Sequence, residues 1–165
     1  MVTERENRHV LVDLDRQRLA LSQHDRILHE YPVSTAKNGP GEAFGSGCTP
    51  RGLHAIRIKI GMDQPVNAVF VGRRPTGEIY SAGLAGEHPE RDWILTRILW
   101  LTGRESGRNR GGDRDTLRRY IYIHGTPDTE PMGEPRSHGC IRMRNEDLVE
   151  LFELVDTGTV VDIRE

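Results

Sequence analysis

A short stretch of this chain, residues 120–144, carries the residue types best suited to covalent chemistry. The alternating run Tyr120–Ile123 ends on His124 and Gly125, and a loop rich in Pro, Gly and acidic residues then leads to Cys140. A thiol attacks an acyl carbon only as the thiolate, and a neighbouring imidazole can take up its proton. The histidine and the cysteine are 140 − 124 = 16 residues apart, a separation that suits a strand, a loop and a return.

The residues just before Cys140 can complete such a site with backbone groups. Ser137, His138 and Gly139 lead directly into the cysteine. Because glycine has no side chain, it lets the backbone approach a substrate closely. The amides of Gly139 and Cys140 can then point at a developing oxyanion. The stretch therefore predicts a nucleophile, a base and an oxyanion-binding backbone.

Two other interpretations of these residues stay open at this point. Cysteine is often only a small buried hydrophobic residue. Nitrogen and sulfur donors also suit zinc, so His124, His138 and Cys140 could be three ligands of a zinc site. In either case the chain would be a zinc- or ligand-binding protein and not an enzyme.

The same residues resemble the signature of a known family. The stretch His124–Thr126, followed by Ser137–Met143 (SHGCIRM), is similar to the signature of the L,D-transpeptidase catalytic domain, the YkuD-like family. The resemblance implies that Cys140 is the acylated nucleophile and that His124 is its base. It also implies that the carbonyl of Gly125 orients the imidazole, and it places His138 in the active site.

The resemblance further implies a substrate, an inhibitor class and a fold. Members of the family act on peptidoglycan stem peptides, so the expected substrate is a murein tetrapeptide that loses its terminal D-Ala. They are acylated by carbapenems, which we expect as covalent inhibitors, and no cofactor or metal is expected. The family's fold is a β-rich sandwich or cradle with few helices. The predicted substrate-binding residues are Arg136, Ser137, His138 and Arg142.

The composition limits the kinds of partner. A chain of 165 residues favours a single domain, 1–165, with enough length for a real core. Charged residues make up 29% of the chain, and the formal net charge is −2. This balance shows no electrostatic footprint of nucleic-acid or membrane binding. A small-molecule or peptide substrate is therefore favoured.

The first residues of the chain determine the location that we expect. A secretory signal needs a positive region and then about 7–15 apolar residues. Here the charged stretch Glu4–Arg8 precedes an apolar run that Asp13 and Asp15 interrupt. No stretch approaches the roughly 18 apolar residues of a membrane span. We therefore expect a cytoplasmic protein.

That expectation ranks the possible reactions. A cytoplasmic enzyme would meet soluble muropeptides and would use water as the acceptor. The sequence therefore favours an L,D-carboxypeptidase of murein recycling, with an L,D-transpeptidase as the alternative.

Hydrophobic patterning outside the motif predicts a chain of mainly β-structure. Leu148, Leu151, Phe152 and Val155 follow helical spacing instead, which predicts an amphipathic helix over about 145–156 with Asn145 as its cap. The expected strands are 10–14, 18–22, 27–33, 68–71, 78–80, 120–123 and 159–163. The pattern of 93–101 fits a helix as well as a strand, and the resemblance to the family implies a strand there.

Two loop segments and two isolated side chains complete the expectations. Ala36–Pro50 is predicted to be a loop, either a flank of the cleft or an ordinary connection. Thr102–Arg119 contains six arginines and four glycines, and we expect a flexible cationic lid that contacts substrate carboxylates. His54 is expected to face solvent, and Cys48 is expected to be a thiol without chemistry.

Overall fold

The protein consists mainly of β-strands. The structure is a computed structural model and describes residues 3–165. Its strands are β1 (Arg8–Asp13), β2 (Arg18–Gln23), β3 (Arg26–Ser34), β4 (Gly52–Ile60), β5 (Ala68–Val71), β6 (Arg74–Ile79), β7 (Ile94–Gly103), β8 (Tyr122–Gly125), β9 (Ile141–Met143) and β10 (Val160–Arg164). Its α-helices are α1 (Ala82–Glu87) and α2 (Asn145–Leu154), and its 3₁₀ helices are η1 (Glu4–Asn7) and η2 (Gly112–Arg114).

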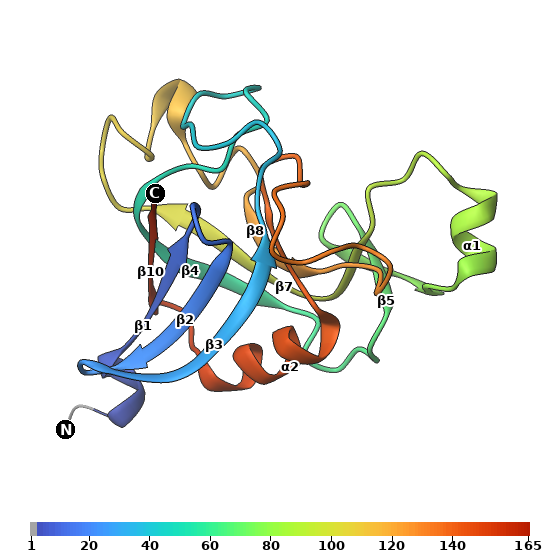
Figure 1. Ribbon diagram of the computed structural model, residues 1–165, viewed down its shortest axis with the longest axis horizontal. Coiled ribbons are helices and arrows are strands. Elements are labelled where there is room, and N and C mark those ends of the chain that lie inside the picture. The colour runs from blue at the N-terminus through green and yellow to red at the C-terminus, as the bar shows by residue number, and fades with distance from the viewer. Residues whose placement is uncertain (1–2) are drawn as a thin grey trace.

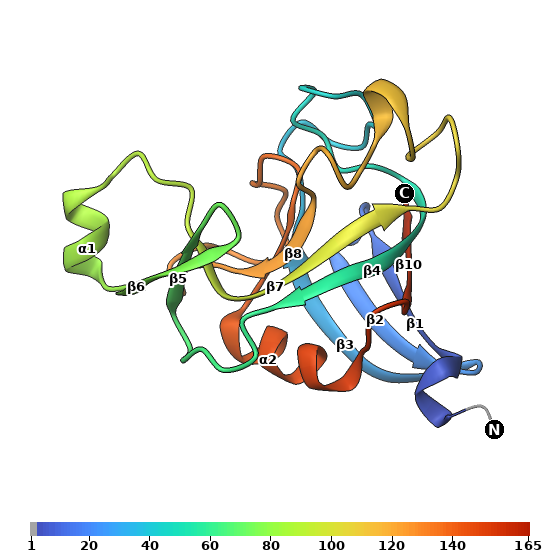
Figure 2. The same ribbon diagram turned by 180° about the vertical axis from the view of Figure 1, so that it is seen from behind.

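These strands form one sheet that closes on itself. Neighbouring strands follow the order β4-β10-β1-β2-β3-β9-β8-β7-β5-β6, and a further pairing joins β4 to β7. Figures 1 and 2 show β1, β2 and β3 on one side and β4 and β7 on the other, with β5, β6 and α1 projecting as an arm. The prediction of a mainly β fold with few helices is confirmed. The sheet is a single closed one and not two separate layers.

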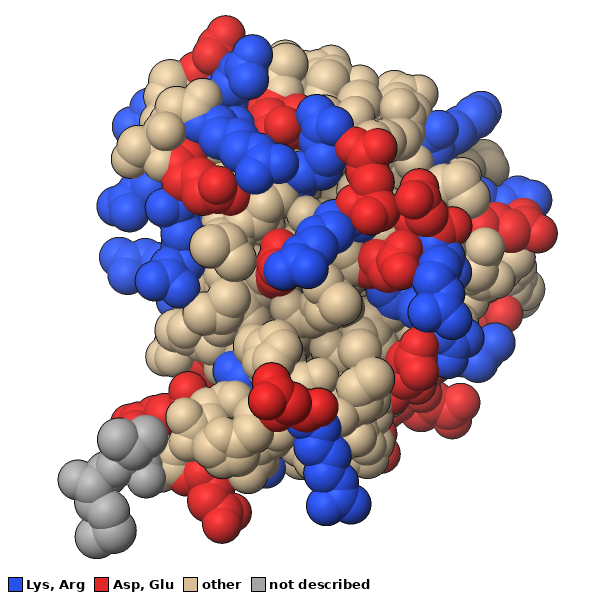
Figure 3. Space-filling view, turned by 60° about the vertical axis from the view of Figure 1, so that its left-hand side comes forward, with Lys and Arg blue, Asp and Glu red and all other residues tan. Residues whose placement is uncertain are grey.

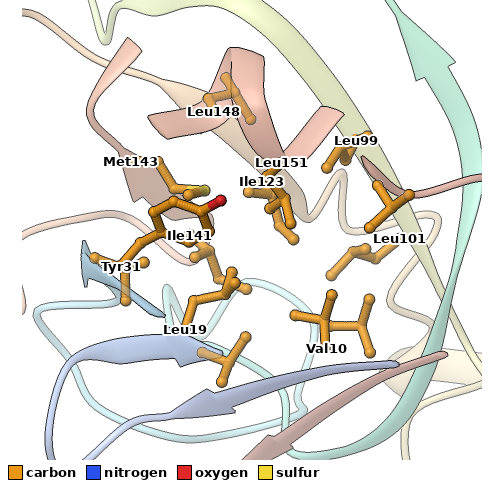
Figure 4. Close-up of a cluster of buried hydrophobic side chains, with 14 of the residues drawn as sticks. Val10, Leu19, Tyr31, Leu99, Leu101, Ile123, Ile141, Met143, Leu148 and Leu151 are labelled. Carbon is orange, nitrogen blue, oxygen red and sulfur yellow. The ribbon is translucent and has the colours of Figure 1, made fainter. Parts of the chain in front are cut away.

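The closed sheet surrounds the main hydrophobic core because its strands alternate inward and outward positions. Full burial of one Leu or Ile side chain is worth about 1.5–3 kcal/mol, so the alternation decides which face of each strand points inward. Figure 4 shows side chains from several strands and from α2 meeting in this core. The cluster includes Val10, Leu19, Tyr31, Leu99, Leu101, Ile123, Ile141, Met143, Leu148 and Leu151.

The helix predicted near the C-terminus is present as α2, and it ends two residues earlier than expected. Its buried side chains include Leu148, Leu151 and Phe152, which follow the predicted spacing. Asn145 does not cap the helix as predicted, because Arg144 occupies the N-cap position. The Asn145 amide is turned instead toward β7 and Thr126. Tertiary contacts therefore replaced the local cap.

Helix α1 was not predicted by the sequence. It has six residues, and none of them is buried, so it carries no apolar stripe that periodicity could reveal. Its start is fixed by Ser81, whose Oγ accepts a hydrogen bond of 3.1 Å from the amide of Leu84. A local cap of this kind supports one helical turn without a hydrophobic face.

The segment predicted to be a flexible lid is mostly held against β4. Asn109 is fully buried, and its Nδ2 donates to the carbonyls of Arg51 at 3.0 Å and Leu53 at 3.1 Å. Thr116 is also fully buried and donates to the carbonyl of Asn109 at 2.9 Å. The prediction of a flexible lid is therefore wrong for most of the segment. The two polar side chains that fix it cannot be recognised from a Gly- and Arg-rich composition.

His54 lies inside the molecule and does not face solvent, contrary to the prediction. It is 0% exposed, its Nδ1 lies 2.9 Å from the carbonyl of Gly52, and its Nε2 lies 3.0 Å from Thr116 Oγ1. Burial disfavours the charged imidazole and lowers the pKa of His54 from 6.5 to about 4. The imidazole is therefore neutral at pH 7.

The surface carries charges of both signs. Figure 3 shows Lys and Arg interleaved with Asp and Glu over the face that it presents. Over the whole sequence the formal net charge is −2. Within residues 3–165, no helix has the length and apolar character that crossing a membrane requires.

The buried His54 predicts a loss of stability in acid. Its pKa is about 4 in the folded protein and 6.5 when the ring is exposed, so the unfolded state binds the proton more readily. This contribution to stability is complete above pH 6.5 and falls toward pH 4 by roughly 1.4 kcal/mol per pH unit. Urea unfolding of the His54→Gln variant should therefore show a shallower loss over this range than the wild type. Equal slopes would contradict the assignment.

Candidate active site

The candidate site is built on two neighbouring parallel strands, β8 and β9. Their register pairs Ile123 with Ile141 and His124 with Arg142. Side chains alternate across a sheet, so the two isoleucines enter the core while His124, Arg142 and Cys140 share the opposite face. The structure therefore brings the predicted histidine and cysteine to one face of adjacent strands.

The histidine of this pair is buried and held in one orientation. His124 is 1% exposed, and its Nδ1 lies 2.6 Å from the carbonyl oxygen of Gly125. Because a carbonyl only accepts, Nδ1 carries the hydrogen, and the lone pair is on Nε2. Burial lowers the pKa of His124, with the carbonyl contact acting in the opposite direction. The free protein therefore holds a neutral imidazole with Nε2 able to accept a proton.

Close packing explains why a glycine follows the histidine. A Cβ added at Gly125 would lie 2.2 Å from Asn145 Oδ1 and 2.6 Å from the carbonyl oxygen of Leu95. Asn145 Nδ2 donates to the carbonyl of Thr126 at 3.0 Å, and its Oδ1 accepts from Thr96 Oγ1 at 2.7 Å. These contacts fix the backbone whose carbonyl orients His124.

Thr96 is a supporting residue that the sequence did not reveal. It is fully buried and has φ +75°, a backbone region that is costly for a β-branched residue. It lies where β7 shifts register against β8, between Leu95 and Ile98. Thr96 and its partner Asn145 carry no motif signal, because their role arises from contacts across the fold.

The sulfur of Cys140 contacts the backbone on either side of Ile121. The amide of Tyr122 donates to Sγ at 3.3 Å, and the thiol donates to the carbonyl of Tyr120 at 3.3 Å. Within residues 3–165, no hydrogen bond joins Sγ to His124. The thiol must therefore leave the Tyr120 carbonyl before its proton can reach the imidazole.

Loss of solvent also favours the neutral thiol of Cys140, which is partly buried. It is the largest influence and raises the pKa of Cys140 from 9.0 to about 12, while the amide of Tyr122 acts to lower it. Of the charged groups nearby, Asp92 also raises this pKa, and Arg142 and Arg119 lower it. In the free protein, Cys140 and His124 therefore do not form the thiolate–imidazolium pair that proton transfer from thiol to imidazole would give. Both groups are uncharged.

The turn before Cys140 is held by Ser137, which the sequence predicted as a substrate-binding residue. Ser137 is 2% exposed, and its Oγ donates to the carbonyl of Cys140 at 2.5 Å. The same Oγ accepts from the amide of Gly139 at 3.2 Å. The Ser137 side chain is therefore engaged inside this turn, and its contact with a substrate stays a prediction. Of the two amides predicted to bind an oxyanion, that of Gly139 is engaged internally and that of Cys140 makes no hydrogen bond to a side chain within residues 3–165.

Gly139 is required by the backbone of this turn. Its φ is +135°, in the region that favours glycine, and an added Cβ would lie 3.2 Å from the carbonyl oxygen of Cys48. The loop Ala36–Pro50 thus passes directly beside the cysteine turn. Cys48 itself is a free thiol, and Arg119 Nη2 donates to its carbonyl at 2.7 Å.

An acidic residue that the sequence did not single out lies over the same face. Asp92 Oδ1 accepts from Arg142 Nη2 at 2.9 Å, and Asp92 Oδ2 lies 3.2 Å from His138 Nδ1. Burial by itself raises the pKa of Asp92, but the neighbouring basic groups, Arg142 and His138 among them, act against it, and the pKa is lowered. Asp92 is therefore an anion at neutral pH. Its neighbours in the sequence form no motif, so only the fold identifies it.

Two cavities meet at His138, whose side chain is largely exposed. The larger has a volume of about 780 Å³, and the smaller has about 340 Å³. The charged residues that line the larger are Lys37, Arg91, Asp92, Glu130, Glu134, Arg136 and Arg142. The smaller is lined by Phe44, Gly45, Gly47, Arg118, Arg119, Tyr120, Ile121 and His138.

Only some residues of the predicted lid, Thr102–Arg119, and of the predicted loop, Ala36–Pro50, line these cavities. Of the six arginines in Thr102–Arg119, Arg118 and Arg119 line the smaller cavity. Arg108 pairs instead with Glu105 at 3.3 Å, away from His138. Phe44 of the loop Ala36–Pro50 lines the smaller cavity, so this loop flanks the cleft.

The zinc alternative finds no ligand set in the structure. Among residues 3–165, no group of three or more His, Cys, Asp or Glu side chains is arranged to hold a metal ion. Zinc sites of the kind considered need at least three such donors around one point. His124, His138 and Cys140 do not form such a group.

A cysteine and a histidine on one face of a closed β-sheet are the features that a thiol-dependent enzyme would need, and comparison with known proteins identifies the family of this chain. The model of the YkuD L,D-transpeptidase catalytic domain matches residues 7–163. The chain therefore belongs to the L,D-transpeptidase catalytic domain family. The family predicted from the His124 and Cys140 motifs is confirmed.

Relatives in two bacilli carry the same family name. "Putative L,D-transpeptidase YkuD" from Bacillus licheniformis is 44% identical over 154 residues, which cover 93% of this chain and 64% of the relative. The protein of that name from Bacillus subtilis is 26% identical over 160 residues, which cover 94% of this chain and 65% of the relative. The chain thus spans slightly less than two thirds of the length of these relatives.

The fold is shared with solved structures. A crystal structure of L,D-transpeptidase 3 from Mycobacterium tuberculosis, in complex with a faropenem-derived adduct, matches with a TM-score of 0.57 at 18% identity. The match covers 96% of this chain and 60% of that one. At this identity the likeness concerns the fold.

The neutral state of Cys140 can be tested by alkylation. Because burial raises its pKa to about 12, the thiolate fraction should increase about tenfold per pH unit between pH 7 and 9.5. We expect the rate of modification by iodoacetamide to follow this slope, measured by peptide mass spectrometry in a Cys48→Ala background. A rate that is high and constant above pH 6 would instead show a thiolate–imidazolium pair.

Proposed function

We propose that this protein is a cysteine-dependent acyl-transfer enzyme that acts on peptidoglycan stem peptides and cleaves the bond before a terminal D-Ala. One observation carries the proposal: a buried His124, oriented through Nδ1 by the carbonyl of Gly125, shares a sheet face with Cys140. Membership of the L,D-transpeptidase catalytic domain family supports the same chemistry. In this proposal Cys140 is the nucleophile and His124 is the base.

The reaction begins with two neutral groups. As Sγ of Cys140 bonds to the acyl carbon, the thiol proton leaves the Tyr120 carbonyl and moves to Nε2 of His124. The acyl oxygen becomes an oxyanion, which the amide of Cys140 stabilises in this proposal. When the tetrahedral intermediate collapses, the imidazolium returns its proton to the leaving amine and a thioacyl enzyme remains.

The charges of the larger cavity support an anionic donor. Lys37, Arg91, Arg136 and Arg142 contribute four cations, and Asp92, Glu130 and Glu134 contribute three anions. Arg118 and Arg119 add two cations at the smaller cavity. Guanidinium groups pair well with carboxylates, so the free carboxylate of a terminal D-Ala suits this lining.

Arg91 of the larger cavity is already paired with Glu78, so the excess of positive charge comes from Arg118 and Arg119 at the smaller cavity, and it also bears on the acceptor. A positive lining repels an ammonium-bearing acceptor and leaves water unaffected. We therefore propose that water resolves the thioacyl enzyme, with His124 as the base, which makes the protein an L,D-carboxypeptidase. The proposal includes action on soluble tetrapeptides in the cytoplasm during murein recycling, and cell fractionation tests that location.

One observation favours the alternative, transfer to an amine. Glu130 and Glu134 line the larger cavity with side chains that are 39% and 58% exposed, and they could pair with an incoming ammonium group. An L,D-transpeptidase would use such groups to hold the acceptor peptide. Glu130→Gln and Glu134→Gln would then lower transfer without lowering hydrolysis.

Acylation by a β-lactam tests the assignment of the nucleophile. The faropenem-derived adduct of the mycobacterial relative supports the expectation that imipenem or faropenem acylates this protein. Intact-mass analysis should show one adduct, on Cys140, in the wild type and in Cys48→Ala. The adduct should be absent from Cys140→Ala, and it should form at least a hundredfold more slowly in His124→Ala because the base is lost. An adduct on Cys48 would overturn the assignment.

Product analysis tests the proposed reaction. With a disaccharide tetrapeptide, tripeptide and free D-Ala should form even when glycine or a D-amino acid is supplied, and Cys140→Ala should be inactive. Amidating the terminal carboxylate removes a charge-assisted hydrogen bond, which is worth about 1.5–3 kcal/mol. We therefore expect kcat/KM to fall by roughly ten- to a hundredfold.

The same product analysis can also show that transfer to an amine is the reaction. If the amine-exchange product dominates at millimolar D-amino acid, transfer is the reaction and the carboxypeptidase proposal is wrong. Mass spectrometry distinguishes the two products in one reaction mixture.

A further inference from the structure

Arg142 is a buried cation with part of its hydrogen-bonding capacity unused. It is 7% exposed and lines the larger cavity. Within residues 3–165, its Nε is buried and has no hydrogen-bond partner. Buried polar atoms are nearly always paired, and an unpaired one calls for an explanation. A guanidinium binds a carboxylate best through two parallel N–H groups, so this side chain is only partly satisfied.

The present partners of Arg142 do not occupy its Nη2 and Nε groups together. Asp92 Oδ1 accepts from Nη2 at 2.9 Å, and the carbonyl of Arg136 accepts from Nη1 at 3.4 Å. Glu130 Oε2 lies farther away, 3.8 Å from Nη1. Asp92 therefore makes a single contact with the cation, and its other oxygen is turned to His138.

Asp92 approaches Arg142 from the side of the cavity. Both residues line it, and the Asp92 side chain is 47% exposed while that of Arg142 is 9% exposed. A ligand in the cavity thus meets Asp92 before it meets Arg142. The carboxylate can move away by rotation about its own side-chain bonds, because among residues 3–165 only His138 and Arg142 contact it through hydrogen bonds.

The backbone that carries Asp92 is anchored on both sides. Arg91 Nη1 pairs with Glu78 at 3.0 Å, and the Arg91 guanidinium lies 5.3 Å from the ring centroid of Trp93. Trp93 in turn makes an edge contact with Tyr80 at 5.1 Å between ring centroids. Asp92 lies in the connection between α1 and β7, and contacts of its two neighbours with residues of the arm therefore hold it at the site.

We propose that Asp92 is a specificity-determining residue that occupies the carboxylate-binding position on Arg142 in the free protein, so that a ligand must displace it with a carboxylate of its own. The incoming carboxylate takes Nη2 and the unused Nε together, which Asp92 does not do. A ligand without a carboxylate has nothing to exchange for the lost ion pair. This proposal rests on the proposed function for its substrate, since the terminal carboxylate of the donor peptide is the expected ligand.

The test measures binding of a small acid without any turnover. N-acetyl-D-alanine is titrated into the ¹⁵N-labelled protein, and its Kd is followed by chemical shifts in the wild type and in Asp92→Asn. Removing an ion-pair competitor should tighten binding roughly three- to tenfold. N-acetyl-D-alaninamide should bind the two proteins with equal affinity.

The direction of the change separates this role from a merely structural one. If Asp92 served to position Arg142, the Asp92→Asn variant would bind the acid more weakly, and that result, like an unchanged Kd, would overturn the proposal. A double variant adds a second condition: in an Arg142→Gln background, Asp92→Asn should produce no gain. A folded spectrum is required of each variant, and Asp92→Ala replaces Asp92→Asn if the latter does not fold.

A matched control comes from the segment that carries Asp92. Glu90 is exposed and does not line the larger cavity, so Glu90→Gln removes one negative charge nearby without freeing Arg142. Its effect on the Kd of N-acetyl-D-alanine should stay below about twofold, as expected of an exposed charge. An equal gain in both variants would show a general effect of charge and overturn the role of Asp92. If the titrations give the predicted result but the protein does not cleave the tetrapeptide, the proposed function is rejected and the role of Asp92 is kept.

Discussion

Strands β8 and β9 lie parallel, and their pairing divides the side chains of both strands between two environments. Ile123 and Ile141 face the core, and His124 and Arg142 face the site. A shift of either strand by one residue would exchange these faces and expose the isoleucines. The hydrophobic core therefore holds the chemical groups in register, and the stability of the core and the geometry of the site are not independent.

Burial imposed by this register also determines the charge state of the site. The imidazole of His124 and the thiol of Cys140 both lose solvent, and each is driven toward its neutral form. A neutral thiol is a poor nucleophile and resists adventitious alkylation and oxidation. Chemistry then depends on a substrate that brings Sγ away from the Tyr120 carbonyl and toward Nε2.

Fixed charges surround this neutral pair. Arg142 and Asp92 are linked across the site, and the latter also contacts His138. Such a linked set lets a carboxylate on a ligand replace a carboxylate of the protein without leaving a buried cation unpaired. Recognition of the ligand and rearrangement of the site would then be one event.

The sequence by itself determined the family, the nucleophile and base candidates, most of the strands and helix α2, because alternation, helical spacing and the motif at His124 and Cys140 are local patterns. Only the tertiary structure decided the rest. His54 is buried, and Asp92 reaches Arg142 from the connection between α1 and β7. Burial and ion pairing arise between segments far apart in the chain, so no local pattern of residues encodes them.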